Sequence, residues 1–284
     1  MSEHRRVAAV AGAVMLAWLP AIGCVQANRP DESRCLLQGY VYYLDGAGGG
    51  GAILNWSGGV KKGLEDAGYD VFGEMFGWQT GLGALADQGA GADYKQAKGK
   101  ELVRRIQEHR LDCPHDPIHL IALSAGTAVA VFALEALPDN GPVENVVLLG
   151  ASVSANYDLT QALRHVRNRL FIFTSPADTI LSFLVPFVGT ADRAPGGSGP
   201  AGLAGFILPR DASEETRRLY AEKVVTKAWS PEFEAAGNYG GHLDNVSAAF
   251  IRDHVAPLVT EGKVPASGKV PASPPPAPLA KPPK

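Results

Sequence analysis

The sequence has few positive charges in its central region. Residues 24–262 carry 20 Lys and Arg against 28 Asp and Glu, and the last 22 residues carry four lysines and no acid. A protein that binds nucleic acid needs a basic surface that neutralises phosphates. The mildly acidic central region therefore argues against nucleic acid as the main partner.

The sequence also lacks an N-terminal apolar run of membrane-spanning length. Arg5 and Arg6 precede residues 7–19, which are thirteen residues without a charge, whereas a helix needs about 20 residues to cross a bilayer. A short apolar run behind positive residues is typical of an export signal. A buried N-terminal helix is the alternative. We expect residues 1–23 to be a signal peptide and the mature protein to leave the cytoplasm.

The end of this apolar segment resembles the lipobox of bacterial lipoproteins. It reads Ala21-Ile22-Gly23-Cys24, with alanine where leucine is usual. The resemblance implies that Cys24 is lipidated, becomes the new N-terminus and attaches the protein to a membrane. A competing cut after Ala27, which follows Val-Gln, would instead release a periplasmic or secreted protein.

Motifs for cofactors are missing as well. Residues 45–51 read Asp-Gly-Ala-Gly-Gly-Gly-Gly, but the Gly-Lys-Ser/Thr of a phosphate-binding loop does not follow. Cys113, His115 and His119 lie close together in the sequence. Their spacing matches no standard zinc motif, and His119 falls in an expected strand. We therefore expect neither a metal nor another cofactor.

The sequence does contain a regular alternation of strand-like and helix-like segments. Strands are expected at residues 36–44, 70–76, 118–123, 143–150, 169–174 and 223–229, and helices at 52–67, 93–110, 125–137, 159–166, 210–221 and 243–259. This alternation indicates an α/β protein with a mostly parallel sheet of about six strands. We expect one domain over residues 36–259, preceded by a linker at 24–35.

Two segments do not fit the alternation. Residues 182–209 are apolar, rich in Gly and Pro, and long for a plain connection. They form either a lid over an apolar pocket or a loop packed over the sheet. Residues 262–267 repeat at once as 268–273, and Pro, Ala and Lys follow. This composition predicts a disordered tail over residues 260–284.

One strand is followed by a serine and then by a helix-like segment. Ser124 comes directly after the apolar run at 118–123, with Ala122 and Gly126 two residues to either side. Small neighbours allow the sharp strand-to-helix turn of a nucleophile elbow. In this Ala-x-Ser-x-Gly pattern the sequence resembles the α/β-hydrolase superfamily, whose usual pattern begins with glycine. The resemblance implies a three-layer sandwich over residues 36–259 and a serine nucleophile.

The resemblance also assigns partners to the serine. Ser124, Asp178 and His242 follow three different strands in the chain order that this superfamily uses. His242 would take the proton of the serine hydroxyl, and Asp178 would orient the imidazole and stabilise its charged form. Asp158, after the preceding strand, is the alternative acid.

An oxyanion hole is the next implied feature. The amide of Ala125 at the start of the following helix is one expected donor. The glycine-rich loop after the first strand would supply the second donor, with Ala47 as first choice and Gly46 as second. Trp78, in the loop at 77–92, either contacts substrate or packs within that loop.

Together these features predict an exported serine hydrolase that cleaves a carboxylic ester through an acyl-enzyme intermediate. A carboxylesterase or lipase acting on a small-molecule ester is the simplest reading. Amidase or acyltransferase activity is an alternative within the same chemistry. A membrane-anchored binding or scaffold lipoprotein on an inactive hydrolase fold is an alternative of a different class.

The resemblance further implies a disulfide between Cys35 and Cys113. These residues precede the strands at 36–44 and 118–123, which would be direct, parallel neighbours in an α/β-hydrolase sheet. Adjacent strands lie about 4.8 Å apart, within the Cα separation of about 4.4–6.8 Å that a bridge needs. Two free, buried thiols are the alternative.

Overall fold

The computed structural model describes residues 35, 38–51, 54–193 and 199–261. The expected signal peptide, the lipidation candidate Cys24 and the tail from residue 262 onward lie outside these residues. Within the described part, no helix is both long and apolar enough to cross a membrane.

Six parallel strands form a single sheet in the order β2-β1-β3-β4-β5-β6. The strands are β1 (Tyr40–Leu44), β2 (Phe72–Met75), β3 (Ile118–Leu123), β4 (Val143–Leu149), β5 (Val166–Thr174) and β6 (Val224–Ala228). Parallel neighbours require a crossover connection between them, and helices supply it here. The predicted α/β class with a parallel sheet of about six strands is confirmed.

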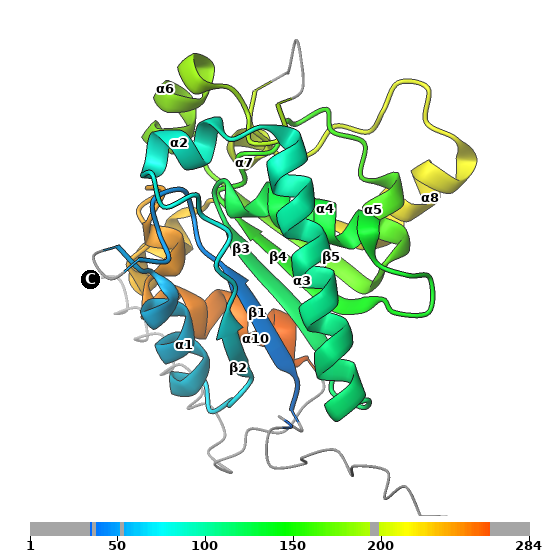
Figure 1. Ribbon diagram of the computed structural model, residues 1–284. Helices are drawn as coiled ribbons and strands as arrows, with labels where there is room; N and C mark the ends of the chain where they lie inside the picture. Colours follow the sequence, from blue (N-terminus) through cyan, green and yellow to red (C-terminus); the bar gives the residue numbers. More distant parts are fainter. Residues whose placement is uncertain (1–34, 36–37, 52–53, 194–198, 262–284) are drawn as a thin grey trace, which may run out of the picture.

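Helices cover both faces of the sheet and make three layers (Figure 1). One face carries α3 (Ala92–Asp112), α4 (Gly126–Ala136), α5 (Thr160–Arg164) and α8 (Glu214–Lys223); the other carries α1 (Ser57–Asp66), α9 (Ala248–Phe250), a π-helical turn (Ile251–Val255) and α10 (Ala256–Thr260). Successive strand residues point to opposite faces. Tyr42 and Leu44 of β1 therefore pack with the first group, whereas Val41 and Tyr43 pack with the second.

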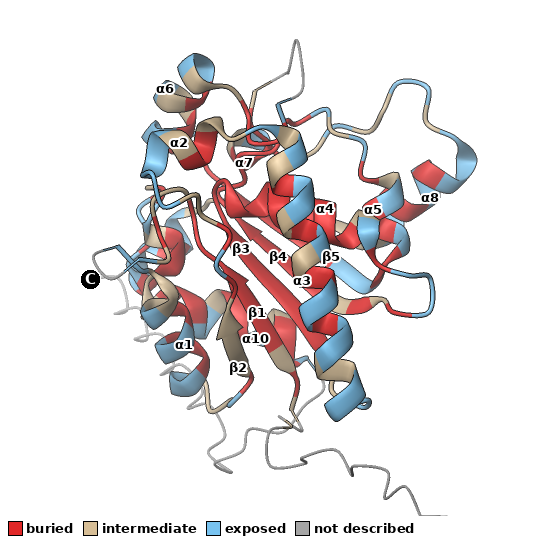
Figure 2. Cartoon of the chain, in the orientation of Figure 1, coloured by how far each residue is buried: buried red, intermediate tan, exposed pale blue. Residues whose placement is uncertain are grey.

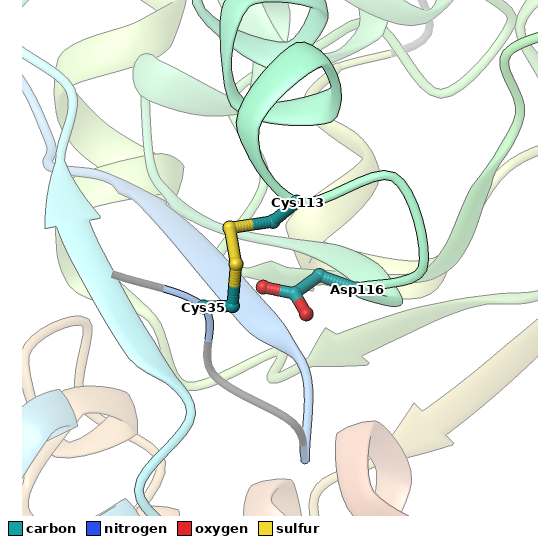
Figure 3. Close-up of side chains that lie close together, drawn as sticks. All are labelled: Cys35, Cys113 and Asp116. Atoms are coloured by element: carbon teal, nitrogen blue, oxygen red, sulfur yellow. A yellow bond between two sulfur atoms is a disulfide. The ribbon is translucent and has the colours of Figure 1, made fainter. Parts of the chain in front are cut away.

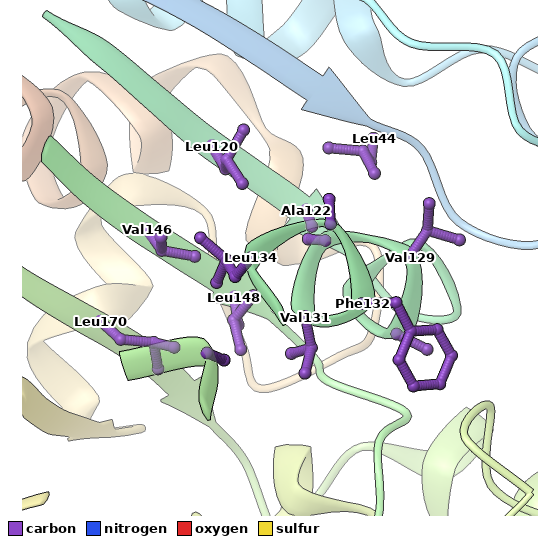
Figure 4. Close-up of a cluster of buried hydrophobic side chains, with 14 of the residues drawn as sticks. Leu44, Leu120, Ala122, Val129, Val131, Phe132, Leu134, Val146, Leu148 and Leu170 are labelled. Atoms are coloured by element: carbon purple, nitrogen blue, oxygen red, sulfur yellow. The ribbon is translucent and has the colours of Figure 1, made fainter. Parts of the chain in front are cut away.

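The centre of the molecule is β3 together with α4. Every residue of β3 is buried, and α4 is buried on all sides from Gly126 to Leu134 (Figure 2). A helix that is apolar all round belongs in a core. Here α3 covers its outer side, and a Cβ atom on Gly99 of α3 would lie only 2.8 Å from Ala133 N. Apolar side chains from the strands and from α4 gather in one buried cluster (Figure 4), and the turn between β3 and α4 lies within this core.

Several boundaries differ from the sequence-based expectation. The first strand begins at Tyr40 and the first helix at Ser57. Residues 77–92, expected as loop, contain the short helix α2 (Ala84–Gly89). The closing helix expected at 243–259 is broken into a 3-10 turn (Asp244–Val246), α9, the π-helical turn and α10. Distant contacts hold α2, whereas a new cap and a proline interrupt the closing helix, as described below.

Cys35 and Cys113 form a disulfide, with their Cα atoms 5.5 Å apart (Figure 3). The two strands that follow them pair directly, with Tyr40 of β1 opposite Ile118 of β3. Both cysteines therefore lie at the edge of the sheet where these strands begin. The predicted bridge is confirmed.

Removing this bridge is expected to destabilise the protein strongly. The two cysteines are 78 residues apart in the sequence, and the chain-entropy estimate for a loop of that length is about 4 kcal/mol. Urea unfolding of Cys35→Ser and Cys113→Ser should show this loss in the free energy of unfolding, and reduction of the unmutated protein should show a similar one. A loss below about 1 kcal/mol in all three samples would contradict the prediction.

Candidate active site

The turn between β3 and α4 holds Ser124 in a strained conformation. Its φ is 53°, in the left-handed region that residues other than glycine rarely adopt. Its amide donates to Leu149 O at the end of β4 (3.0 Å), and its carbonyl accepts from Thr127 N (3.1 Å). The expected small neighbour is required, because a Cβ atom on Gly126 would lie 2.5 Å from Asp45 O. Such strain persists only where the surrounding structure enforces it, and it is common at functional sites.

Asp178 and His242 form a buried pair at the same edge of the sheet. His242 Nδ1 lies 2.6 Å from Asp178 Oδ2, and the two residues are 8% and 1% exposed. The other carboxylate oxygen, Oδ1, accepts from Leu181 N and so caps the first turn of α6 (Thr179–Val188). The main chain of His242 is fixed in turn, because its carbonyl accepts from Asn245 Nδ2 (3.2 Å).

Gly150, at the end of β4, connects this pair to the serine. A Cβ atom on Gly150 would lie 3.0 Å from His242 Nδ1 and 3.3 Å from Asp178 Oδ2. Its neighbour Leu149 accepts the hydrogen bond from the amide of Ser124. The structure thus brings the three predicted residues to one place. Among the described residues, Ser124 Oγ has no hydrogen-bond partner, and catalytic hydrogen bonds are often long before substrate binds.

Asp158, the alternative acid, is not part of this arrangement. It is exposed, and its Oδ1 accepts from Thr160 N (2.8 Å) at the start of α5. Its carboxylate makes the local hydrogen bond to the backbone two residues on that is common for aspartate in turns.

The glycine-rich loop after β1 is organised by the buried carboxylate of Asp45. Oδ1 accepts from Tyr43 Oη (2.9 Å) and from Gly46 N (2.9 Å), and Oδ2 accepts from Gly50 N (3.1 Å) and from Trp56 N (3.0 Å). Burial raises the pKa of the Asp45 carboxyl above its ordinary value, and the donated hydrogen bonds offset part of that rise. No sequence signal pointed to this residue, because its four donors come from both sides of the loop.

These contacts distinguish the two candidates for the second oxyanion donor. The amide of Gly46 is already bonded to Asp45. In the described part of the chain, neither Ala47 N nor Ala125 N donates a hydrogen bond to another protein group. The geometry therefore favours the first choice, Ala47, together with Ala125. Gly46 has a steric role, since a Cβ atom there would lie 3.2 Å from Ser124 Cβ.

A second aspartate, Asp87 of α2, fixes the same loop from outside. Its carboxylate accepts from Gly48 N (2.8 Å), from Thr80 N (2.7 Å) and from Thr80 Oγ1 (2.6 Å). Trp78 is a packed aromatic side chain that joins the hydrophobic core and the glycine-rich loop after β1. It is fully buried, and its Nε1 donates to Asp45 O (2.7 Å).

The buried side chains of Gln88 and Lys95 attach α2 to the rest of the edge. Gln88 Nε2 donates to Ser152 Oγ (2.8 Å) and to Gly189 O (2.9 Å), which joins α2 to the end of α6. Lys95 Nζ donates to Gln88 O and to Ala90 O at the end of α2. Burial lowers the pKa of Lys95 to about 8, and the nearby Arg193 adds to this effect.

Lys95 should give the protein a measurable dependence of stability on alkaline pH. The unfolded chain keeps the lysine protonated up to its ordinary pKa, whereas the folded protein releases the proton near pH 8. Between these values the unfolded state binds more protons, so the free energy of unfolding rises with pH, by at most about 1.4 kcal/mol per pH unit. Relative to Lys95→Met, unfolding curves from pH 7.5 to 10 should show this rise. Parallel curves for the two proteins would contradict it.

The segment at 182–209, expected as either a lid or a packed loop, divides into two parts. Its second part packs on the sheet edge: Ala201 N donates to Val153 O, Gly202 N to Ala151 O and Ile207 N to Ala155 O. Its first part includes most of α6, which starts at Thr179 and exposes large apolar side chains. Residues 194–198, between the two parts, lie outside the described residues.

One group of possible metal ligands occurs among the described residues, at the opposite edge. Cys35, Cys113 and Asp116 bring their ligand atoms within 4.8 Å of one another (Figure 3). Cysteine binds metals as the thiolate, and both sulfurs are committed to the disulfide. His119, a candidate ligand in the zinc motif weighed from the sequence, lies buried within β3, and His115 is exposed.

Comparison with known proteins adds no family to this description. A scan against protein-family models and a search of curated proteins both found no match to the chain. The candidate active site therefore rests on its own geometry: Ser124 on a strained turn, the Asp178–His242 pair beside it, and two unengaged backbone amides next to the serine.

Proposed function

We propose that this protein is a serine hydrolase of the α/β-hydrolase type that cleaves carboxylic esters through an acyl-enzyme intermediate. The observation that carries the proposal is the buried 2.6 Å contact between His242 and Asp178 beside a serine at φ 53°. Two further features support it. The three residues follow different strands, and β1 lies next to β3, as the superfamily resemblance implies.

In the proposed reaction, His242 Nε2 takes the proton of Ser124 as Oγ attacks the ester carbonyl carbon. The buried carboxylate of Asp178 stabilises the imidazolium that forms. The carbonyl oxygen becomes an oxyanion, which accepts hydrogen bonds from the amides of Ala47 and Ala125. The start of α4 adds the positive end of a helix dipole at the same place.

Collapse of this tetrahedral intermediate breaks the bond to the alkoxy group, which leaves as an alcohol with the proton from His242. Water then attacks the acyl group on Ser124 Oγ while His242 takes its proton. The second collapse releases the carboxylic acid and restores the serine hydroxyl. Each step needs only the groups named above, so no cofactor enters the proposal.

The direct test uses an active-site probe and a substrate series. A fluorophosphonate should label the protein at Ser124 in a one-to-one ratio, and p-nitrophenyl esters of increasing chain length should be hydrolysed at different rates. Matched p-nitroanilides would reveal amidase activity. Intact protein that is neither labelled nor active on any of these esters would favour the inactive scaffold.

The proposed function includes export. The disulfide between Cys35 and Cys113 supports it, because such bonds persist in oxidising compartments and are rare in the cytosol. We further propose that Cys24 carries a lipid anchor, on the resemblance to a lipobox.

Loss of Cys24 should change where the protein is found. If this residue is lipidated, the mature protein should sediment with membranes, and Cys24→Ser should release it or leave it unprocessed. Mass spectrometry of the purified protein gives its N-terminus and any attached lipid. An unmodified N-terminus at Asn28 would instead identify an ordinary secreted protein.

A further inference from the structure

Helix α6 presents an apolar side to solvent directly beside the candidate site. Its ten residues include no charged side chain, and Ile180, Phe183 and Phe187 are 44%, 70% and 88% exposed. These positions are spaced by three and four residues, so they lie along one side of the helix. Solvent-facing helix sides in soluble proteins are usually polar.

Helix α2 extends this surface. It packs beside α6 above the sheet (Figure 1). Leu82, two residues before α2 begins, and Leu85, in its first turn, are 82% and 65% exposed. We call the surface formed by Leu82, Leu85, Ile180, Phe183 and Phe187 the apolar face. Two phenylalanines and three aliphatic side chains at these exposures amount to several hundred Å², the size at which an exposed apolar patch marks an interaction site.

Both helices of the apolar face are attached to the candidate active site. The first turn of α6 is capped by Asp178, the partner of His242. Helix α2 holds the glycine-rich loop after β1, because the Asp87 carboxylate accepts a hydrogen bond from Gly48 N. Gln88 joins the two helices by its contact with Gly189 O. The two helices that carry the apolar face therefore border the candidate active site.

The chemistry of the apolar face fits lipid better than protein. Its five side chains offer no charge and no hydrogen-bonding group, whereas protein interfaces surround a small apolar core with polar partners and use Tyr and Arg as anchors. Its area is also below the roughly 800 Å² per partner of a standard protein interface. Helices that lie on lipid insert Phe, Leu and other apolar side chains into the acyl boundary.

We infer that the apolar face docks onto the surface of a lipid aggregate and that the substrates are water-insoluble esters taken from that surface. The docking follows from the described surface alone, and the substrate class rests on the proposed function. The disulfide precedes β1 and β3, whose first residues lie at the end of the sheet away from α2 and α6 (Figure 1).

Docking is tested with phosphatidylcholine vesicles that carry brominated acyl chains, which quench tryptophan on contact. The variants are Phe187→Trp and, as a matched control, Leu111→Trp, each combined with Ser124→Ala so that the lipid is not hydrolysed. Leu111 is similarly exposed, at 78%, but lies near the disulfide at the end of α3. We expect at least twofold more quenching for Phe187→Trp than for Leu111→Trp, and loss of that excess when Phe183→Ser is added.

Equal quenching of the two variants would overturn the docking inference, whether or not the enzyme is active. So would a concentration-dependent dimer that Phe183→Ser abolishes, because a second copy would then cover the face.

The substrate class is tested in the active protein with the double variant Phe183→Ser, Phe187→Ser. Its KM for an emulsified long-chain ester should rise at least tenfold, with kcat/KM for a soluble acetate ester unchanged. If the double variant lost the same factor of kcat/KM on both esters, the inferred substrate class would be overturned. If the unmutated protein were inactive on both esters, the proposed function itself would be refuted.

Discussion

Replacing Ser124 with alanine is expected to lower kcat for ester hydrolysis by about 10⁶-fold, as removal of the nucleophile does in serine proteases. The substitution deletes one oxygen that has no hydrogen-bond partner among the described residues, so the fold should survive it. Steady-state kinetics on a p-nitrophenyl ester give the rate, and thermal unfolding checks the fold. Near-normal turnover by a folded variant would rule out Ser124 as nucleophile.

Two further variants sharpen this test. Ser124→Gly should also be inactive, yet more stable than the unmutated protein by about 1 kcal/mol, because glycine adopts the φ of 53° without strain. Ser152→Ala is the matched control: Ser152 is a buried serine nearby whose hydroxyl is bonded to Gln88. This variant should keep the fluorophosphonate label, whereas both Ser124 variants should lose it.

Replacing Asp178 with asparagine is expected to lower kcat by about 10⁴-fold, the effect seen when the acid of a serine protease triad becomes an amide. Asparagine would place an amide where His242 Nδ1 now contacts Asp178 Oδ2 at 2.6 Å, and so would favour the wrong imidazole tautomer. An amide oxygen can still accept from Leu181 N and cap α6. The variant should therefore lose activity with little loss of stability.

Asp158→Asn is the control for this prediction. Its exposed side chain bonds to Thr160 at the start of α5, so the substitution should leave kcat within about twofold of the unmutated value, as expected of surface changes away from the reaction. The measurement is kcat for both variants on one soluble ester. A large loss in Asp158→Asn with a small one in Asp178→Asn would transfer the role of acid to Asp158.

Asp45 provides a test of the glycine-rich loop after β1 that leaves Ser124, Asp178 and His242 unchanged. Asp45→Asn replaces one accepting oxygen by an NH₂ group, which would face N–H or O–H donors now bonded to the carboxylate. The loop should shift and displace Ala47 N, and the loss of one oxyanion donor lowers kcat by about 10²–10³-fold. We expect kcat to fall with KM little changed. A rise in KM at constant kcat would indicate a role in substrate binding instead.

Much of the fold could be predicted because strand and helix patterns are local. The apolar runs at 118–123 and 143–149 are strands of the sheet, and the small residues around Ser124 mark the turn between strand and helix. The pairing of Cys35 with Cys113 also followed, once β1 and β3 were expected to be neighbours.

Two elements escaped prediction because distant contacts or a missing donor shape them. Helix α2 has six residues between glycines and is held by Lys95, Gln88 and Asp87 rather than by its own propensity. In the closing segment Ser247 starts a new helix by accepting from Phe250 N. Pro257 has no backbone N–H and cannot donate the hydrogen bond of a regular α-helical turn. The residues before it adopt a π-helical turn.

For the candidate site, the sequence by itself determined which reactive side chains follow the strands and in what order, because strand ends are readable from local patterns. Only the tertiary structure decided which of them meet. His242 contacts Asp178 across 64 residues, while Asp158 bonds to Thr160 two residues on. The Gly46 amide is bonded to Asp45, which leaves Ala47 N free of a protein partner in the described chain. Asp158 and Asp178 both follow strands, and Gly46 and Ala47 are neighbours in one loop, so local sequence patterns cannot tell the members of each pair apart. What differs is their distance from groups elsewhere in the chain, and the packing of separate crossover connections sets those distances.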